Sequence, residues 1–288
     1  MGIFKKAKTT WKKVKYYVGA TVCAGAFFGG LTMVGKNLIA DSDNIRVRCF
    51  VGDVGTGEKG EQLVAERMKT EGCQEIVMLG DLVYETGLHS PDDPNFEGHF
   101  WKFYKDFPRL VLTQGNHDSY SSQQGLESWI VLSARHSSIV YPAHFFTYQS
   151  GDWCYFSWFS EAVERDDDNK FSRAQDDFAK NIKFADSCKI KVSLAHHPMK
   201  SSGEHGNCAK NVCEFYKRNI IGKFDLSFAG HEHDIEDVGE IGGTYFYVSG
   251  GGSKTRPCVE NEGKTCWGKL GFMKFIGNSK TPEIIFVE

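Results

Sequence analysis

The stretch IRVRCFVGDVGTGEKGEQLVAERMKTEGCQEIVMLGDLVY, residues 45–84, decides the fold class. Its first apolar run, 45–51, predicts a strand, the amphipathic segment 58–71 closed by Gly72 predicts a helix, and 76–79 predicts a second strand. Such βα alternation is typical of α/β proteins. Asp53 and Asp81 each follow a glycine directly after one of the two strands.

The remaining sequence extends this alternation. We expect a helix with an aromatic core stripe over 95–107 and a helix opened by a capping box at Ser172 and Gln175 that runs to about 185. Further strands are expected at 110–113, 141–148, 153–159, 190–195, 225–229 and 245–249. The acidic run 166–168 is interpreted as a solvated loop. Together these elements favour an α/β sandwich with mixed sheets.

Composition limits the function classes. The 288 residues are 41% hydrophobic and 25% charged, which excludes wholesale disorder, and no repeat or heptad pattern is present. The net charge of -3 is uneven, because residues 1–40 hold seven lysines and no acid. The remainder therefore has 27 basic against 37 acidic residues, a charge of -10, and we expect it not to bind nucleic acid.

Residues 1–43 predict a leader that is separate from the body, 44–288. Six lysines between positions 5 and 15 precede an uncharged stretch, 16–35, which is long enough to cross a hydrocarbon layer of about 30 Å as a helix. This order is typical of a signal peptide or a membrane signal-anchor, and it predicts a secreted, lysosome-like or membrane-anchored domain. A transit peptide and a basic surface helix are the alternatives, and cleavage stays open.

The chain has nine cysteines, a high count for one domain. Cys23 lies in the leader, which leaves eight, an even number that permits disulfides. Two pairs flank short polar loops, a feature that favours an oxidising compartment. These pairs are Cys208 with Cys213 and Cys258 with Cys266. Cys49 and Cys154 lie in apolar runs, so we expect them to be buried thiols.

Five short segments place Asp, Asn or His directly after an apolar strand. They are Gly52-Asp53-Val54-Gly55, Gly80-Asp81-Leu82-Val83-Tyr84, Gly115-Asn116-His117-Asp118, Ala195-His196-His197-Pro198 and Gly230-His231-Glu232-His233. Strand ends in α/β folds converge on one crevice, so we expect these side chains to meet. A neighbouring glycine lets the backbone turn sharply and leaves the approach to an ion open.

The donors in these segments suit two metal ions better than one. Two carboxylates, an amide oxygen and three imidazoles are too many ligands for a single tetrahedral zinc. With two adjacent cations one carboxylate must bridge, and a pair roughly 3.5 to 4 Å apart binds a phosphoryl group and generates hydroxide near neutral pH. The pattern therefore predicts hydrolysis without a protein nucleophile.

This ordered set resembles the calcineurin-like metallophosphoesterases, and Tyr84, three residues after Asp81, resembles the purple acid phosphatases of the tartrate-resistant type. The resemblance covers most of residues 46–252 and includes 141–142, 204–206 and 249–252. It implies a four-layer αββα sandwich with two mixed sheets. It also implies a binuclear-metal acid phosphatase that hydrolyses phosphate monoesters, of small molecules or peptides, by attack of a metal-bound hydroxide.

The same resemblance implies a role for each site residue. The metal ligands would be Asp53, Tyr84 and His233 for a ferric ion, Asn116, His196 and His231 for Fe(II), Zn or Mn, and Asp81 as the bridge. His117 is implied as a phosphate contact and leaving-group acid, with Asp118 orienting it, and His205 as a second substrate-side histidine. A hard trivalent ion suits a phenolate and acidifies bound water, so activity at acid pH is implied.

Several alternatives stay open. If Tyr84 is a packed aromatic residue, the site is a divalent-only phosphoesterase; the fold also suits phosphodiester, pyrophosphate or phosphoprotein substrates. The basic leader suits a membrane-tethered scaffold with incidental catalysis.

Lys254 and Arg256 either approach a phosphate or lie in a solvated loop. His197 stands where the family often has an aromatic residue, and we expect it, like Glu232, behind the ligands or exposed. The oligomeric state is not indicated.

Overall fold

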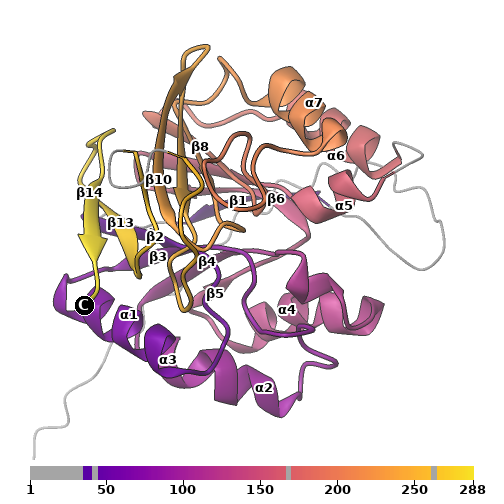
Figure 1. Ribbon diagram of the computed structural model, residues 1–288. Coiled ribbons are helices and arrows are strands. Elements are labelled where there is room, and N and C mark those ends of the chain that lie inside the picture. The colour runs from indigo at the N-terminus through magenta and orange to yellow at the C-terminus, as the bar shows by residue number, and fades with distance from the viewer. Residues whose placement is uncertain (1–34, 41–44, 167–169, 261–264) are drawn as a thin grey trace, which may run out of the picture.

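A computed structural model describes residues 35–40, 45–166, 170–260 and 265–288, and it consists of two β-sheets between two groups of helices (Figure 1). The six-stranded sheet has the order β14 (Glu283–Phe286), β13 (Gly271–Ile276), β2 (Val47–Val51), β3 (Glu75–Leu79), β4 (Arg109–Thr113) and β5 (Ile139–Val140). Strands β2 to β5 are parallel, and β13 is antiparallel to both β2 and β14.

The eight-stranded sheet is also mixed. Its order is β1 (Gly35–Ala40), β6 (Phe145–Ser150), β7 (Trp153–Ser157), β8 (Ile190–Leu194), β9 (Leu226–Ala229), β11 (Thr244–Ser249), β10 (Ile235–Ile241) and β12 (Cys266–Trp267). Strands β7, β8, β9 and β11 run parallel, while β6, β10 and β12 pair antiparallel to a neighbour. The carboxyl ends of β8 and β9 therefore lie at one edge, as those of β2, β3 and β4 do in the other sheet.

Helices cover the outer faces of both sheets (Figure 1). The helices of the first half are α1 (Lys59–Thr70), α2 (Pro94–Phe96), a π-helical turn (Glu97–Trp101), α3 (Lys102–Tyr104) and α4 (Gln123–Arg135). The others are α5 (Ser160–Glu164), α6 (Lys170–Lys180) and α7 (Lys210–Asn219), which lie against the eight-stranded sheet. Two helical layers around two mixed sheets confirm the expected αββα fold class.

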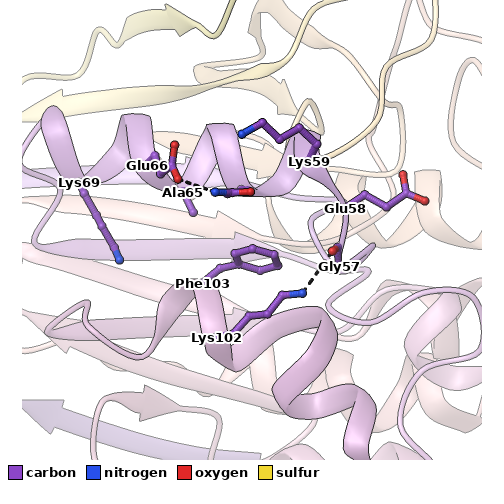
Figure 2. Close-up of a pocket in the computed structure, with 9 residues that line it drawn as sticks. Gly57, Glu58, Lys59, Ala65, Glu66, Lys69, Lys102 and Phe103 are labelled. Carbon is purple, nitrogen blue, oxygen red and sulfur yellow. Dashed lines mark hydrogen bonds between the residues drawn. The ribbon is translucent and has the colours of Figure 1, made fainter.

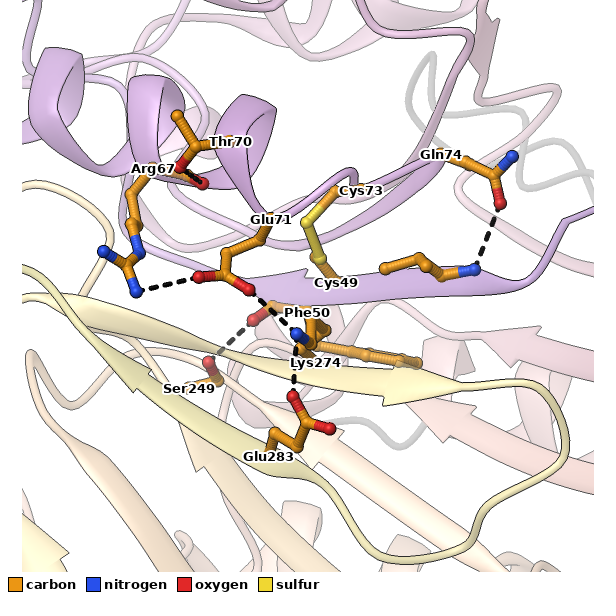
Figure 3. Close-up of a disulfide and its surroundings, with 11 residues drawn as sticks. Cys49, Phe50, Arg67, Thr70, Glu71, Cys73, Gln74, Ser249, Lys274 and Glu283 are labelled. Atoms are coloured by element: carbon orange, nitrogen blue, oxygen red, sulfur yellow. Dashed lines mark hydrogen bonds and ion pairs between the residues drawn. A yellow bond between two sulfur atoms is a disulfide. The ribbon is translucent and has the colours of Figure 1, made fainter.

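The inner faces of the two sheets meet in an aromatic core. The ring of Phe50 on β2 stacks on that of Phe228 on β9, with centroids 4.0 Å apart. Phe275 on β13 packs edge-on against both rings. Ser249 Oγ, at the end of β11, donates a hydrogen bond of 2.8 Å to the Phe50 carbonyl (Figure 3). These contacts fix the strand ends of the two sheets relative to each other.

A buried ion pair within the six-stranded sheet is hydrogen-bonded to the other sheet. Arg48 Nε on β2 lies 3.1 Å from Glu75 Oε1 on β3, and neither side chain is more than 3% exposed. The Glu75 carboxylate also accepts 2.7 Å hydrogen bonds from Tyr155 Oη and Ser150 Oγ of the other sheet. Burial of a charge is tolerated only when it is paired and hydrogen-bonded in this way.

The cysteine predictions are partly confirmed and partly wrong. The described residues hold four disulfides, Cys49–Cys73, Cys154–Cys188, Cys208–Cys213 and Cys258–Cys266. The last two join the pairs that flank short loops. Cys49 and Cys154 are buried but are not free thiols. Figure 3 shows why for Cys49: the turn after α1 returns Cys73 to β2, a contact between positions 24 residues apart.

Helix α6 differs from its prediction. It begins at Lys170, so Ser172 lies inside the helix instead of capping it, and it ends at Lys180. The carboxylate of Asp166 accepts hydrogen bonds from the backbone N–H groups of Lys170 and Ser172, and Asp166 is buried. The first acid of the run expected to be solvated therefore fixes the helix start. Residues 167–169 lie outside the described part of the chain.

The predicted leader lies mostly outside the described residues. Strand β1 falls within its range and pairs parallel with β6. Among the residues that the structure describes, no helix combines the length and the apolar character that crossing a membrane requires.

Candidate metal centre

Five loops at strand ends bring the predicted metal ligands together. Asp53 follows β2, Asp81 follows β3 and Asn116 follows β4, while His196 and His231 follow β8 and β9. Asp53, Asp81 and His231 have φ angles of 59°, 53° and 72°. Non-glycine residues rarely adopt this left-handed conformation, and they cluster at functional sites when they do. Six of the seven predicted ligands are buried, and His231 is partly exposed.

Glycine is required where two of these loops cross. A Cβ atom on Gly115 would lie 2.1 Å from Asp81 Oδ1, closer than any real contact. The loop after β4 can therefore approach the Asp81 carboxylate only because position 115 lacks a side chain.

The first group of ligands is Asp53, Tyr84 and His233. Tyr84 Oη lies 3.2 Å from Asp53 Oδ1 and 3.1 Å from His233 Nε2. His233 Nε2 lies 3.5 Å from Asp53 Oδ1. The three donor atoms thus form a triangle of the size that ligand atoms take around one ion.

The second group is Asn116, His196 and His231. Asn116 Oδ1 lies 2.9 Å from His196 Nε2 and 3.2 Å from His231 Nδ1, and the two ring nitrogens are 3.3 Å apart. The amide orientation follows from Tyr120, whose hydroxyl accepts a 2.6 Å hydrogen bond from Asn116 Nδ2. His196 Nδ1 donates to the Leu79 carbonyl, which leaves Nε2 as the ligand atom.

Asp81 adjoins both groups. Its Oδ1 lies 3.4 Å from His196 Nε2, and single donor atoms of Asp53, Asp81 and His196 lie within 4.8 Å of one another. The charge of Asp81 also acts on the Asp53 carboxyl group. A residue in contact with both groups is the one that can bridge two ions, as the resemblance implies for Asp81.

The electrostatics of the donors fit a pair of cations. Burial and the charge of Asp81 raise the pKa of Asp53 well above its ordinary value, and burial with the charge of Asp53 raises that of Tyr84. Burial lowers the pKa of His196 to about 4 and the pKa of His233 to about 3. The pKa of His231 is also lowered by burial. The protein alone thus favours neutral imidazoles, which are free to ligate, and penalises both anions, which bound cations would stabilise.

The donor set also indicates which ions fit. Carboxylate, phenol, amide oxygen and imidazole are hard to borderline ligands, and no thiolate joins either group among the described residues. The phenol makes the Asp53 group the one that suits a trivalent ion. The Asn116 group suits a divalent ion.

The structure corrects the role expected for Asp118. Its buried carboxylate accepts hydrogen bonds from the backbone N–H groups of Leu82, Val83 and Gly115, at 2.8 to 3.3 Å. His117 Nδ1 instead donates to the Glu85 carbonyl at 2.6 Å. Asp118 therefore fixes the loops after β3 and β4, and a backbone carbonyl orients His117.

His117 and His205 flank the buried donors on their accessible side. The His117 ring lies 4.5 Å from that of Tyr84, and its Nε2 is the ring nitrogen not used by Glu85. The His205 ring lies 4.4 Å from that of His231. His205 Nδ1 lies 3.2 Å from Glu232 Oε2. Glu232, which we expected either behind the ligands or exposed, is buried. His205 itself is 42% exposed.

Sequence reasoning missed the neighbours of His197. Its Nδ1 lies 2.9 Å from Ser160 Oγ, and its Nε2 lies 2.8 Å from Glu164 Oε2 and 3.4 Å from Glu161 Oε2. Ser160 Oγ also accepts hydrogen bonds from the backbone N–H groups of His196 and His197, so its own hydrogen is donated to His197 Nδ1. The His197 ring therefore carries a hydrogen on Nε2 and donates it to α5. No sequence signal connected α5 to this loop.

A surface groove lies apart from these donors. It has a volume of about 510 Å³ and lies along α1 and α3, with Lys59, Lys69 and Lys102 among its lining side chains (Figure 2). Lys102 Nζ donates to the Gly57 carbonyl within it, at 3.3 Å. None of the predicted site residues lines this groove.

Comparisons with known proteins agree with this geometry. A family model for calcineurin-like phosphoesterase matches residues 49–234. Purple acid phosphatase 7 of Arabidopsis thaliana is 27% identical over 265 residues, which cover 82% of this chain and 80% of that protein. Tartrate-resistant acid phosphatase type 5 of Homo sapiens is 25% identical over 231 residues, which cover 73% of this chain and 70% of that protein.

Solved structures share the fold. One described as GAP50, the anchor in the inner membrane complex of Plasmodium, has a TM-score of 0.62 at 15% identity and covers 84% of this chain and 89% of that chain. TT1561 of Thermus thermophilus has a TM-score of 0.52 at 11% identity, and the match covers 85% of this chain and 100% of that chain. The family implies a phosphoesterase with a binuclear metal centre. With its family match over more than half its length, this chain belongs to the calcineurin-like phosphoesterases.

Proposed function

We propose that this protein is an acid phosphatase that hydrolyses phosphate monoesters with two metal ions, a ferric ion at Asp53, Tyr84 and His233 and a divalent Fe, Zn or Mn ion at Asn116, His196 and His231. The observation that carries the proposal is that seven donors, scattered from position 53 to 233, form two adjacent groups joined by Asp81. Bound there, the cations supply Lewis acidity and lower the pKa of water, so that a nucleophile is available.

His117 is the residue that handles the leaving group. Its Nδ1 hydrogen is donated to the Glu85 carbonyl, so a second proton taken up by the ring resides on Nε2. That nitrogen is free to donate to the ester oxygen as the bond to phosphorus breaks. His205, held by Glu232, offers a second contact to phosphate.

The proposal includes the compartment. Four disulfides favour an oxidising environment, which agrees with a secretory leader. The substrates proposed are small-molecule or peptide phosphate esters, reached through the side where His117 and His205 lie.

The test is hydrolysis by residues 1–288 and by Asp81→Asn, after loading with iron and zinc. We expect the wild type to release p-nitrophenol from p-nitrophenyl phosphate faster than from its bis-ester, and Asp81→Asn to lose roughly three or more orders of magnitude in kcat. Asp106→Asn, at an exposed carboxylate outside the site, is the matched control. Equal rates for wild type and Asp81→Asn would reject the proposal; faster bis-ester hydrolysis would assign a phosphodiesterase instead.

A further inference from the structure

Two cations approach the donor groups from a single anchored loop. Lys254 and Arg256 follow β11 and the glycine run, and neither is a predicted ligand. Ser253 Oγ donates to the Asp53 carbonyl, and Arg256 N donates to the His233 carbonyl at 2.8 Å. The Cys258–Cys266 disulfide fixes the loop on its other side. The backbone of this loop is therefore held against the backbone of two metal-ligand positions.

Arg256 lies beside the second substrate-side histidine. Its Nη1 is 3.2 Å from His205 Nδ1 and 3.4 Å from His205 Nε2. The His205 ring in turn packs 4.4 Å from the ring of His231. Burial and the positive charge of Arg256 lower the pKa of His233, so the guanidinium acts electrostatically on the metal centre.

Lys254 lies beside Tyr84. Its Nζ is 5.5 Å from the centre of the Tyr84 ring, and that ring is 4.5 Å from the His117 ring. One loop thus places one cation beside His205 and another beside Tyr84, whose ring packs against that of His117. Both histidines are expected to contact the scissile phosphate.

The present partners of these cations are weakly held. Lys254 Nζ lies 3.5 Å from Glu85 Oε1, and Arg256 Nε lies 3.4 Å from Glu204 Oε2. The two glutamates are 72% and 65% exposed, and exposed pairs of this kind contribute about 0 to 1 kcal/mol. An anionic ligand can displace both carboxylates at little cost, whereas the loop that carries the cations stays in place.

We propose that Lys254 and Arg256 form a subsite for a second anionic group of the substrate, a phosphate or carboxylate close to the scissile phosphate. The proposal rests on the proposed function for the position of the scissile phosphate. It makes this protein selective for doubly anionic phosphate compounds over esters with an uncharged leaving group. Guanidinium and ammonium groups are the side chains that bind such anions best.

The test compares the binding of pyrophosphate and of inorganic phosphate to the metal-loaded protein by isothermal titration calorimetry. We expect wild type to bind pyrophosphate at least about tenfold more tightly than phosphate. The Lys254→Ala/Arg256→Ala variant should lose most of this ratio between the two affinities. The charge-preserving Lys254→Arg/Arg256→Lys variant should keep it, as should Lys183→Ala at an exposed site. High salt should reduce the wild-type ratio, because exposed charges are screened.

Hydrolysis distinguishes the source of the second anion. Phenyl phosphate, 4-carboxyphenyl phosphate and 1,4-phenylene bisphosphate differ only in the group opposite the ester, so a gain in kcat/KM for the second or third substrate identifies carboxylate or phosphate. A wild-type binding ratio that survives in the double alanine variant would overturn the subsite. If no substrate is hydrolysed but the ratio depends on the two cations, the subsite stands and the proposed function fails.

Discussion

Replacement of Asp118 by alanine separates a loop-fixing carboxylate from one that orients a catalytic histidine. The side chain is fully buried and accepts hydrogen bonds from three backbone N–H groups, of Leu82, Val83 and Gly115. Each N–H group left without an acceptor costs about 1 to 3 kcal/mol. We therefore expect Asp118→Ala to lower the free energy of unfolding by about 3 to 9 kcal/mol in total.

The assay is thermal unfolding followed by circular dichroism, in a chelator so that metal affinity does not contribute. At about 2 to 4 °C per kcal/mol for a domain of this size, Asp118→Ala should melt roughly 6 to 36 °C below wild type. His117→Ala is the matched control: its ring is partly exposed and bonded to one carbonyl, so its melting temperature should change by no more than about 2 °C. In the loaded enzyme it should lower kcat by roughly 10² to 10⁴.

Two results would refute this reasoning. One is an Asp118→Ala protein that melts within about 2 °C of wild type. The other is a loss of kcat in Asp118→Ala equal to that in His117→Ala, with no further loss in the double variant. Either outcome would return Asp118 to the role of orienting His117.

Three other changes test separate parts of the structure. Glu75→Gln should lower the free energy of unfolding by about 3 to 5 kcal/mol, because it leaves Arg48 buried without its charged partner. The double variant Arg48→Met/Glu75→Leu should recover at least half of this loss, measured by urea denaturation. A Glu75→Gln variant as stable as wild type would contradict the account. Tyr84→Phe should remove a visible absorption band of the iron-loaded protein, since only a phenolate gives charge transfer to ferric iron; an unchanged band would place the phenolate elsewhere. The Cys258→Ser/Cys266→Ser variant should lose about 2 to 3 kcal/mol of stability, measured by denaturation. It should also lose part of the preference for pyrophosphate over phosphate, measured by calorimetry. An unaltered preference would show that the loop holds its cations without the disulfide.

The ligands were predictable from sequence because each one is encoded locally. Asp53, Asp81 and Asn116 follow glycines directly after apolar strands, and parallel strands bring their carboxyl ends to one edge whatever the details of packing. The same local logic gave strands β2, β3 and β4 almost to the residue. His196 and His231 belong to the other sheet, so their meeting with Asn116 also requires the two sheets to face each other, as they do in the α/β sandwich that the element pattern favoured.

What sequence reasoning missed depends on contacts between distant positions. Asp118 is adjacent to His117 in the chain, but the 3-10 turn at 117–119 directs its carboxylate to N–H groups 35 and 36 residues away. Cys49 looked like an apolar core residue because its partner lies beyond a whole helix. Asp166 caps a helix whose start the Ser172 pattern misplaced. In each case the decisive partner is set by tertiary packing and not by local propensity.

Anomalous X-ray diffraction from crystals of the iron- and zinc-loaded protein tests the central claim most directly. Two peaks roughly 3.5 to 4 Å apart are predicted, one within bonding distance of Asp53, Tyr84 and His233 and the other within bonding distance of Asn116, His196 and His231. Asp81 should reach both. A single peak, or two peaks without a shared carboxylate, would contradict the account.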